Sequence, residues 1–142
     1  MMFRNEFAFL SNFYHCQIII LINGNETVVN SVEHAYQALK TTDQKKRMEI
    51  ALASTPANAK RLGKEVDVRE GWDEHKVELM EKLVRRKFDD EFLALQLIAT
   101  YPLDIVEENY WGDTFWGICK GIGKNHLGKI LMKIRDELRE EK

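Results

Sequence analysis

The sequence has few of the residues that cross-link small secreted domains or bind metals. Its 142 residues include two cysteines, Cys16 and Cys119, which lie far apart and outside any C-x-x-C pair. We therefore expect free thiols, with neither a disulfide framework nor a zinc site of regular spacing. The four histidines form no H-E-x-x-H motif or other i, i+4 pair, so no metal site is expected.

Long apolar runs and a strong excess of one charge are also missing. The longest apolar run, Ile18 to Ile22, is far too short to span a membrane, and Arg4 and Glu6 stand where a signal peptide would become apolar. We therefore expect a cytoplasmic protein with no membrane partner. A formal net charge of −2 gives no overall basic field for indiscriminate nucleic-acid binding, so any nucleic-acid contact should be local.

Length and composition predict a single domain over residues 1–142. With 44% hydrophobic residues, a chain of this length can bury one ordinary core but is too short for two. The sequence contains no repeats, low-complexity stretches or linkers. One domain is therefore the expectation.

The local patterns predict a mainly helical α+β domain with a small antiparallel β-hairpin. The β-branched residues 17–22 lead into Asn23-Gly24, a pair that favours a tight turn, and then into residues 27–29. The next helix is expected to have Asn30 as its N-cap and Glu33 as the capping-box partner, and to run to about Lys40.

Helices are expected over most of the remaining chain. Gly63 is predicted to end a short helix in a left-handed conformation, and residues 103–109 are expected to be extended. Caps, prolines and apolar spacing predict helices over residues 43–52, 55–63, 72–88, 90–100 and 125–138.

The most distinctive segment is a loop rich in glycine and aromatic residues, residues 110–128. Glycine fills no volume and a buried aspartate such as Asp113 needs partners, so core packing does not account for this composition. Gly123 follows Gly117 by six positions, whereas a P-loop has five and needs Ser or Thr where Asn125 stands. A dinucleotide fingerprint also fails, because no βαβ unit precedes the glycines. No cofactor is therefore expected.

This loop leads into a predicted helix N-terminus at Asn125, where backbone amides favour an anion such as phosphate. The alternative is that the glycines only shape a turn and Asn125 is only an N-cap. Lys120, Lys124 and Lys129 flank the loop and are predicted to be placed for phosphate. The basic clusters at 45–47, 60–64 and 82–87 are mostly interleaved with acidic residues and are interpreted as solvated helix faces.

Helical spacing predicts that a carboxylate and an amine share one face of the helix after Asn30. Glu33 and Lys40 are seven positions apart, about 10 Å along an ideal helix. The pair is therefore a candidate for chemistry on that face. The alternatives are that Glu33 serves only the capping box and that Lys40 is a solvated charge near the helix C-terminus.

Several sequence blocks follow one another in a recognisable order: residues 9–13 (FLSNF), 31–40 (SVEHAYQALK), 69–80, 87–88 and 113–135. Together they resemble the YbiA-like or NADAR proteins, a family whose name refers to NAD and ADP-ribose. The resemblance covers nearly the whole chain. It implies a mainly helical α+β fold and a hydrolase, an N-glycosidase that cuts the bond between a phosphorylated ribose and an amine-bearing heterocycle.

The resemblance implies two substrate types: ribosylamino-pyrimidine intermediates of riboflavin synthesis, and ADP-ribose attached to guanine, including guanine in DNA. We expect the second, because the chain is short and carries Lys120 and Lys124 where family members often have an Asp-Gly turn. The expected partner is therefore a ribosylated or ADP-ribosylated nucleobase, with DNA as its carrier. The alternative from another class is a module that binds ADP-ribose or a nucleotide without cleaving it.

Matching motifs to the family also assigns the site residues. The catalytic residues are Glu33, Lys40 and Asp113, and the substrate-binding residues are Ser11, Asn12, Trp72, Trp116 and Asn125. Two carboxylates suit stabilisation of an oxocarbenium-like sugar and acid-assisted departure of the base. The amine of Lys40 offers a second route through an imine, and the choice between this route and direct water attack stays open. Both tryptophans suit stacking on a base, with core packing as the alternative.

Overall fold

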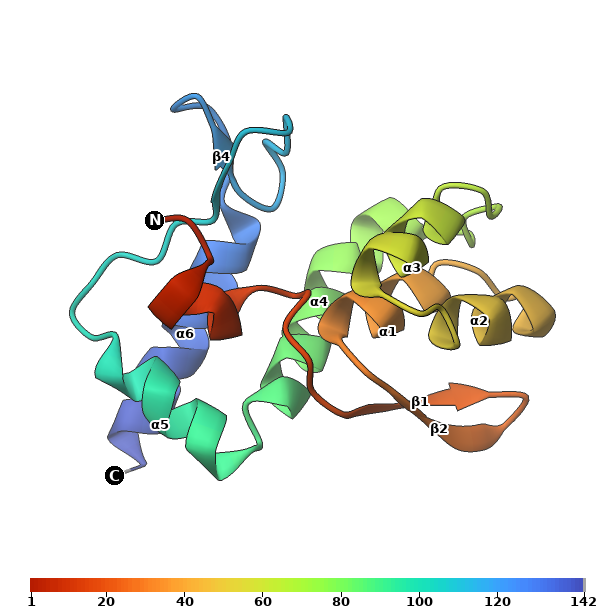
Figure 1. Ribbon diagram of the computed structural model, residues 1–142, viewed down its shortest axis with the longest axis horizontal. Helices are drawn as coiled ribbons and strands as arrows, with labels where there is room; N and C mark the ends of the chain where they lie inside the picture. Colours follow the sequence, from red (N-terminus) through yellow and green to blue (C-terminus); the bar gives the residue numbers. More distant parts are fainter. Residues whose placement is uncertain (142) are drawn as a thin grey trace. The chain divides into compact units, whose positions relative to one another are not determined.

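The structure is a computed structural model that describes residues 1–141, and its chain divides into two units (Figure 1). One unit consists of Met1–Ser11 together with the segment from Phe88 onward, and the other is Asn12–Lys87. Within the described residues, most of the secondary structure is helical and the strands are short. The predicted α+β class, mainly helical with a small antiparallel hairpin, is confirmed.

The unit of residues 12–87 begins with the predicted hairpin. Strands β1 (Ile18–Ile22) and β2 (Asn25–Val29) pair antiparallel, with Ile18 opposite Val29. Asn23 and Gly24 have φ angles of 54° and 75°, as a two-residue turn with both central residues left-handed requires. Residues 18, 20 and 22 are buried and residues 19 and 21 exposed, so one face of the hairpin packs inward.

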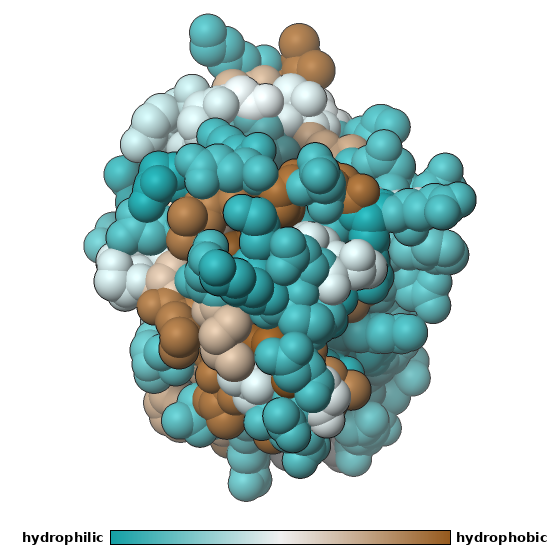
Figure 2. Space-filling view, turned by 90° about the vertical axis from the view of Figure 1, so that its right-hand side faces the viewer, coloured by the Kyte–Doolittle hydropathy of each residue, from teal (hydrophilic) through white to brown (hydrophobic). Residues whose placement is uncertain are grey.

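The outer face of this hairpin is apolar. Ile19, Leu21 and Val28 are 49%, 56% and 53% exposed. Figure 2 views the right-hand side of Figure 1, where apolar groups interrupt a mostly hydrophilic surface.

Helix α1 (Val32–Ala38) is shorter than the sequence pattern indicates. The N-cap is Ser31, whose hydroxyl accepts a hydrogen bond from the His34 amide at 3.0 Å. The prediction of Asn30 as N-cap was therefore wrong, and Glu33 is not a capping-box partner. Asn and Ser are comparably good caps, and the adjacent pair left the first turn ambiguous by one residue. Lys40 lies beyond the helix, so the ideal helical spacing from Glu33 does not apply.

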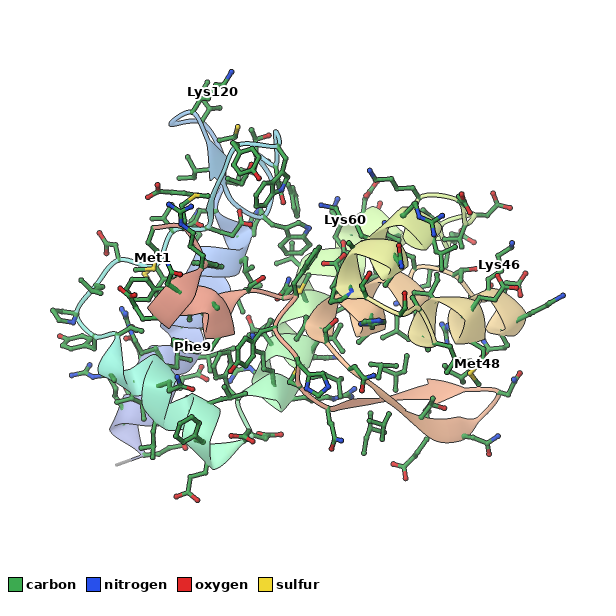
Figure 3. The ribbon with its side chains drawn as sticks, viewed as in Figure 1. Met1, Phe9, Lys46, Met48, Lys60 and Lys120 are labelled. Carbon is green, nitrogen blue, oxygen red and sulfur yellow. The ribbon has the colours of Figure 1, made fainter. Side chains whose placement is uncertain are left out.

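Helices α2 (Gln44–Ala51) and α3 (Pro56–Gly63) begin where the sequence predicts. The Asp43 carboxylate accepts from two amides of the first turn of α2, and the Thr55 hydroxyl accepts from the Asn58 amide in α3. Met48 extends from α2 on the side of the hairpin (Figure 3). Leu52, the residue that follows this helix, is 74% exposed and is not part of the core.

The prediction that Gly63 ends α3 in a left-handed conformation was wrong. It is the last helical residue, and Lys64 caps the helix with an ordinary φ of −76°. Gly63 is buried, and a Cβ at this position would overlap the side-chain amide of Gln37 in α1. Glycine at this position lets α3 lie directly against the Gln37 side chain of α1.

Helix α4 (Trp72–Lys87) completes this unit, begins at the predicted residue, ends one residue before the predicted end, and contacts α1 and β1. Met80, Leu83 and Val84 are almost fully buried along one side. Their spacing is the apolar stripe expected of a helix that faces a core.

The other unit contains the 3₁₀-helix η1 (Asn5–Leu10), α5 (Glu91–Ala99) and α6 (His126–Glu140), with α5 packed on α6. Asp90 caps α5 as predicted, accepting from the Leu93 amide at 3.0 Å. The short strands β3 (Glu108–Asn109) and β4 (Ile118–Cys119) pair in parallel; β3 precedes the glycine-bearing loop segment and β4 lies within it. No helix within residues 1–141 is both long and apolar enough to cross a membrane.

Candidate active site

The predicted site residues divide between the two units. Asn12, Glu33, Lys40 and Trp72 belong to the unit of residues 12–87, whereas Ser11, Asp113, Trp116 and Asn125 belong to the other. Among the described residues, no group of three or more His, Cys, Asp or Glu side chains is arranged to hold a metal ion.

Glu33 is a buried carboxylate, 8% exposed, held in place by its own helix. Gln37, one turn later, donates from Nε2 to Oε2 of Glu33 at 2.6 Å. The backbone amide of Glu33 donates to the carbonyl oxygen of Asn12 at 3.0 Å. Asn12 also directs its side-chain amide at the sulfur of Met80, at 3.4 Å. These contacts fix where the carboxylate lies.

Lys40 is half-buried, with Nζ 6.0 Å from the ring centroid of Tyr36. Burial lowers the pKa of its amine below the usual value, and nearby lysines lower it further, while the Glu33 carboxylate opposes the change. A lowered pKa increases the fraction of neutral amine at neutral pH. Neutral amine is the form that attacks a carbon centre.

Trp72 is buried, with 6% of its surface exposed. Its ring lies 5.1 Å from that of Tyr36, and the guanidinium carbon of Arg69 lies 5.5 Å from the Trp72 ring centroid. In this structure Trp72 packs as a core aromatic residue that supports Tyr36 and Arg69. Stacking of a substrate base on Trp72 stays a prediction.

Asp113 organises the turn that precedes Trp116. Its Oδ1 accepts hydrogen bonds from the amides of Phe115 and Trp116 at 3.0 and 2.9 Å. Asn109 brackets the backbone of Asp113, accepting from its amide at 3.0 Å and donating to its carbonyl at 2.8 Å. The geometry thus gives Asp113 a structural function, and its catalytic function stays a prediction.

Trp116 is half-buried and more accessible than Trp72. Its ring meets Phe115 edge to face at 4.9 Å and lies 6.3 Å from the ring of His126. Of the two tryptophans predicted to bind substrate, Trp116 is therefore the better placed to stack on an incoming ring.

The N-terminus of α6 is already occupied by the chain itself. The amides of residues 124–127 donate to carbonyl oxygens of residues 114–117 at 2.9 to 3.3 Å. Asn125 has φ 53° and makes no side-chain cap; its Oδ1 accepts from the Glu107 amide and its Nδ2 donates to the Ile105 carbonyl, both at 3.0 Å. Asn125 is thus the N-cap residue of α6, as the alternative interpretation had it, although its side chain does not cap the helix. The structure does not support a phosphate on these amides, which bond to loop carbonyls.

Ser11 follows η1, and its amide donates to the carbonyl oxygen of Ala8 at 3.0 Å. Substrate contacts by Ser11, Asn12 and Asn125 stay predictions.

Comparison with known proteins identifies the fold and family. The NADAR domain family matches residues 2–139. The chain belongs to the NADAR family. It is 40% identical over 137 residues to the riboflavin biosynthesis protein VVA0006 of Vibrio vulnificus, covering 94% of this chain and 36% of that protein. It is 39% identical over 130 residues to the N-glycosidase YbiA of Shigella flexneri serotype 5b, covering 87% of this chain and 78% of YbiA.

A solved structure supports the same conclusion. The NMR structure of Escherichia coli YbiA superimposes with a TM-score of 0.84 at 34% identity, covering 99% of this chain and 83% of that one. The NADAR chain spans about a third of the Vibrio protein but most of YbiA. N-glycosidases are hydrolases, so the expected enzyme class is confirmed by the relatives that carry this name.

Several residues around Lys40 in this NADAR chain were not assigned to the site from sequence. The signal for Gln37 was its position one turn after Glu33. Arg69 and Lys76 fall within a family block, but nothing in that block indicates that they lie near Lys40. Lys60 and Lys64 come from a helix whose approach to α1 depends on Gly63, a contact that the linear pattern does not contain.

Proposed function

We propose that this protein is an N-glycosidase that removes ADP-ribose from guanine, as the nucleobase or within DNA. One observation carries the proposal: a buried carboxylate, Glu33, lies within electrostatic range of a half-buried amine, Lys40, whose pKa is lowered. A purely binding module does not need this pair. Both groups are suited to chemistry at the anomeric carbon of a ribose.

In direct hydrolysis, the bond between the anomeric carbon and the base nitrogen breaks while positive charge develops on the sugar. The carboxylate of Glu33 stabilises that charge. A proton moves to the departing nitrogen, and water supplies the hydroxyl that ends on the anomeric carbon. Asp113 is the second carboxylate that the family motif assigns to this step.

In the alternative route, the neutral amine of Lys40 attacks the anomeric carbon and displaces the base, and the proton that the amine loses passes to the departing nitrogen. The sugar ring opens to an imine on Lys40, and water then hydrolyses the imine to release the ribose and restore the amine. The lowered pKa of Lys40 favours this route because it provides neutral amine without a separate base.

The choice of guanine in DNA as the substrate is supported by exposed side chains in the loop of residues 110–128. Tyr110 and Trp111 are 78% and 52% exposed and meet edge to face at 5.1 Å. Lys120 and Lys124 are exposed in the same loop segment, and Lys120 extends outward from it (Figure 3). Exposed aromatic rings and cations within one loop segment suit unstacked bases and phosphates of a nucleic-acid strand.

The second candidate substrate is a ribosylamino-pyrimidine phosphate of riboflavin synthesis. The name of the Vibrio relative favours it. That protein, however, extends far beyond the part that matches this chain, so its name covers segments outside the match. The proposed chemistry at Glu33 and Lys40 is the same for both substrates.

A side-by-side assay separates these possibilities. Purified protein is incubated with DNA ADP-ribosylated on guanine and, separately, with the ribosylamino-pyrimidine phosphate, and released ribosyl product is measured by mass spectrometry. We expect faster turnover of the DNA substrate. Turnover of only the pyrimidine would reverse the ranking, and tight ADP-ribose binding in calorimetry with no cleavage of either substrate would identify a binding module.

A further inference from the structure

We propose that Lys60, Lys64 and Arg69 form a binding site for the phosphoryl group on the substrate ribose, beside Lys40. The inference rests on the proposed function and deepens it. A 5-phosphoryl group is common to ADP-ribose and to a ribosylamino-pyrimidine phosphate, so the site serves either substrate. It also revises the interpretation of residues 60–64 as a solvated helix face.

Helix packing brings these residues to Lys40. Gly63 of α3 abuts the Gln37 side chain of α1 so closely that a Cβ would overlap it. Lys60 precedes Gly63 by three positions and Lys64 follows it directly, so both flank this contact. Lys40 follows Gln37 by three positions. The α1–α3 contact therefore brings together Lys60 of α3 with Lys64 and Lys40, which follow the ends of α3 and α1.

Arg69 is joined to the same place through the backbone. Its amide donates to the carbonyl oxygen of Lys40 at 2.8 Å. Its guanidinium lies over the buried Trp72 ring at 5.5 Å, which limits the positions that the side chain adopts. A guanidinium held in this way presents paired N–H donors that match phosphate oxygens.

Cations outnumber acidic groups among the charged neighbours that shift the pKa of the Lys40 amine. Three of the four charged neighbours that shift the Lys40 amine are cations, Lys76, Lys60 and Lys64, and the fourth is Glu33. The ion pair between Lys76 and Asp73, at 3.2 Å, offsets one cation. Lys60 and Lys64 are further cations near the Lys40 amine, and Arg69 adds a guanidinium.

Acidic residues of the neighbouring loop do not cancel this charge at Lys40. Glu65, Asp67 and Glu70 are exposed, and none of them is among the neighbours that shift the Lys40 amine. The N-terminus of α6 is the other place where a phosphate was expected. Its amides already bond to loop carbonyls and are therefore not available to a phosphate.

The proposal is tested by binding, without turnover. Calorimetry compares ribose 5-phosphate with ribose for the wild-type protein, the double variant Lys60→Gln/Lys64→Gln, and Lys46→Gln. Lys46 is a matched control, an exposed lysine of α2 that lies apart from Lys60 within this unit (Figure 3). Glutamine keeps the length of the side chain and removes its charge, and circular dichroism confirms that each variant is folded.

We expect the wild-type protein to bind ribose 5-phosphate more tightly than ribose. The double variant should lose about tenfold or more of that preference, as is typical for removal of charge-assisted contacts. Lys46→Gln should bind as the wild type does. Equal binding of the two sugars by the wild type, or an unchanged preference in the double variant, overturns the proposal. If ribose 5-phosphate binding follows the prediction while no N-glycosidic bond is cut, the proposed function fails and the phosphoryl site stands.

Discussion

Gln37 donates a hydrogen bond from Nε2 to Oε2 of Glu33 at 2.6 Å, from one turn further along α1. Both side chains are buried, and Oε1 of the same Gln37 amide has no hydrogen-bond partner within the described residues. The bond to Glu33 is therefore what this amide contributes. It holds a carboxylate of the proposed active site in one orientation.

Replacing Gln37 by methionine should separate positioning from binding. Methionine fills similar volume but cannot donate to Glu33, so we expect kcat to fall by about tenfold or more while KM changes little. The buried carboxylate also loses a donor, which should lower the free energy of unfolding by about 1 to 3 kcal/mol. Steady-state kinetics and urea denaturation measure the two effects. A normal kcat in a folded Gln37→Met variant would remove Gln37 from the mechanism.

Gly63→Ala should destabilise the protein, although alanine is the better helix former. In an unhindered helix this change stabilises by about 1 kcal/mol. Here the added methyl group overlaps the Gln37 amide, and such overpacking costs about 1 to 3 kcal/mol. Denaturant unfolding gives the sign directly. A stabilised variant would show that α3 does not press on α1 as described.

These two positions show which features the sequence predicts and which it does not. The caps at Asp43, Thr55 and Asp90 were predictable because each depends on amides two or three residues away. The need for glycine at Gly63 arises from Gln37, 26 positions earlier, and is therefore not visible locally. The local pattern consequently indicated a helix end and missed a helix contact.

The candidate site follows the same rule. Family motifs assigned Glu33 and Lys40, whose environment in the structure suits the proposed chemistry. They did not reveal that Asp113 caps a turn or that Asn125 bonds to backbone groups of residues 105 and 107. The Asn125 bonds join segments that the tertiary fold brings together, so residue type alone did not predict them. The Asp113 bonds are local, to amides two and three residues later, and the family assignment of Asp113 to catalysis did not consider them.

Lys87 gives a prediction for the pH dependence of stability. It is almost fully buried, and burial lowers its pKa to about 8 from 10.5. Below pH 8 the amine is protonated in both the folded and the unfolded state, so the folded state bears the full free-energy cost of burying a charged amine. Between about pH 8 and 10.5 the unfolded chain binds more protons, so this residue makes stability rise with pH.

Lys87→Met should remove that rise and raise the free energy of unfolding at pH 7 by on the order of 1 to 3 kcal/mol. The measurement is urea denaturation of variant and wild type between pH 7 and 10.5. Taking the difference between the two proteins cancels other groups that titrate in this range. A difference that does not change with pH would contradict the lowered pKa.

Lys40 should form a covalent adduct if the imine route operates. Borohydride added during turnover reduces an imine to a stable amine, so peptide mass spectrometry should find the ribosyl group on Lys40. Lys40→Ala should lose both the adduct and most of the activity while remaining folded. A fully active Lys40→Ala variant with no adduct would leave direct water attack, with Glu33 and Asp113, as the mechanism.

The most direct test of the central claim is the rate at which ADP-ribose is released from guanine-ADP-ribosylated DNA by the wild-type protein and by Glu33→Gln. The substitution keeps the shape of the side chain and removes its charge. We predict release by the wild type and a loss of about 10²-fold or more in the variant, as expected when a group that stabilises transition-state charge is removed. Equal rates for the two folded proteins, or no release by the wild type, would contradict the account.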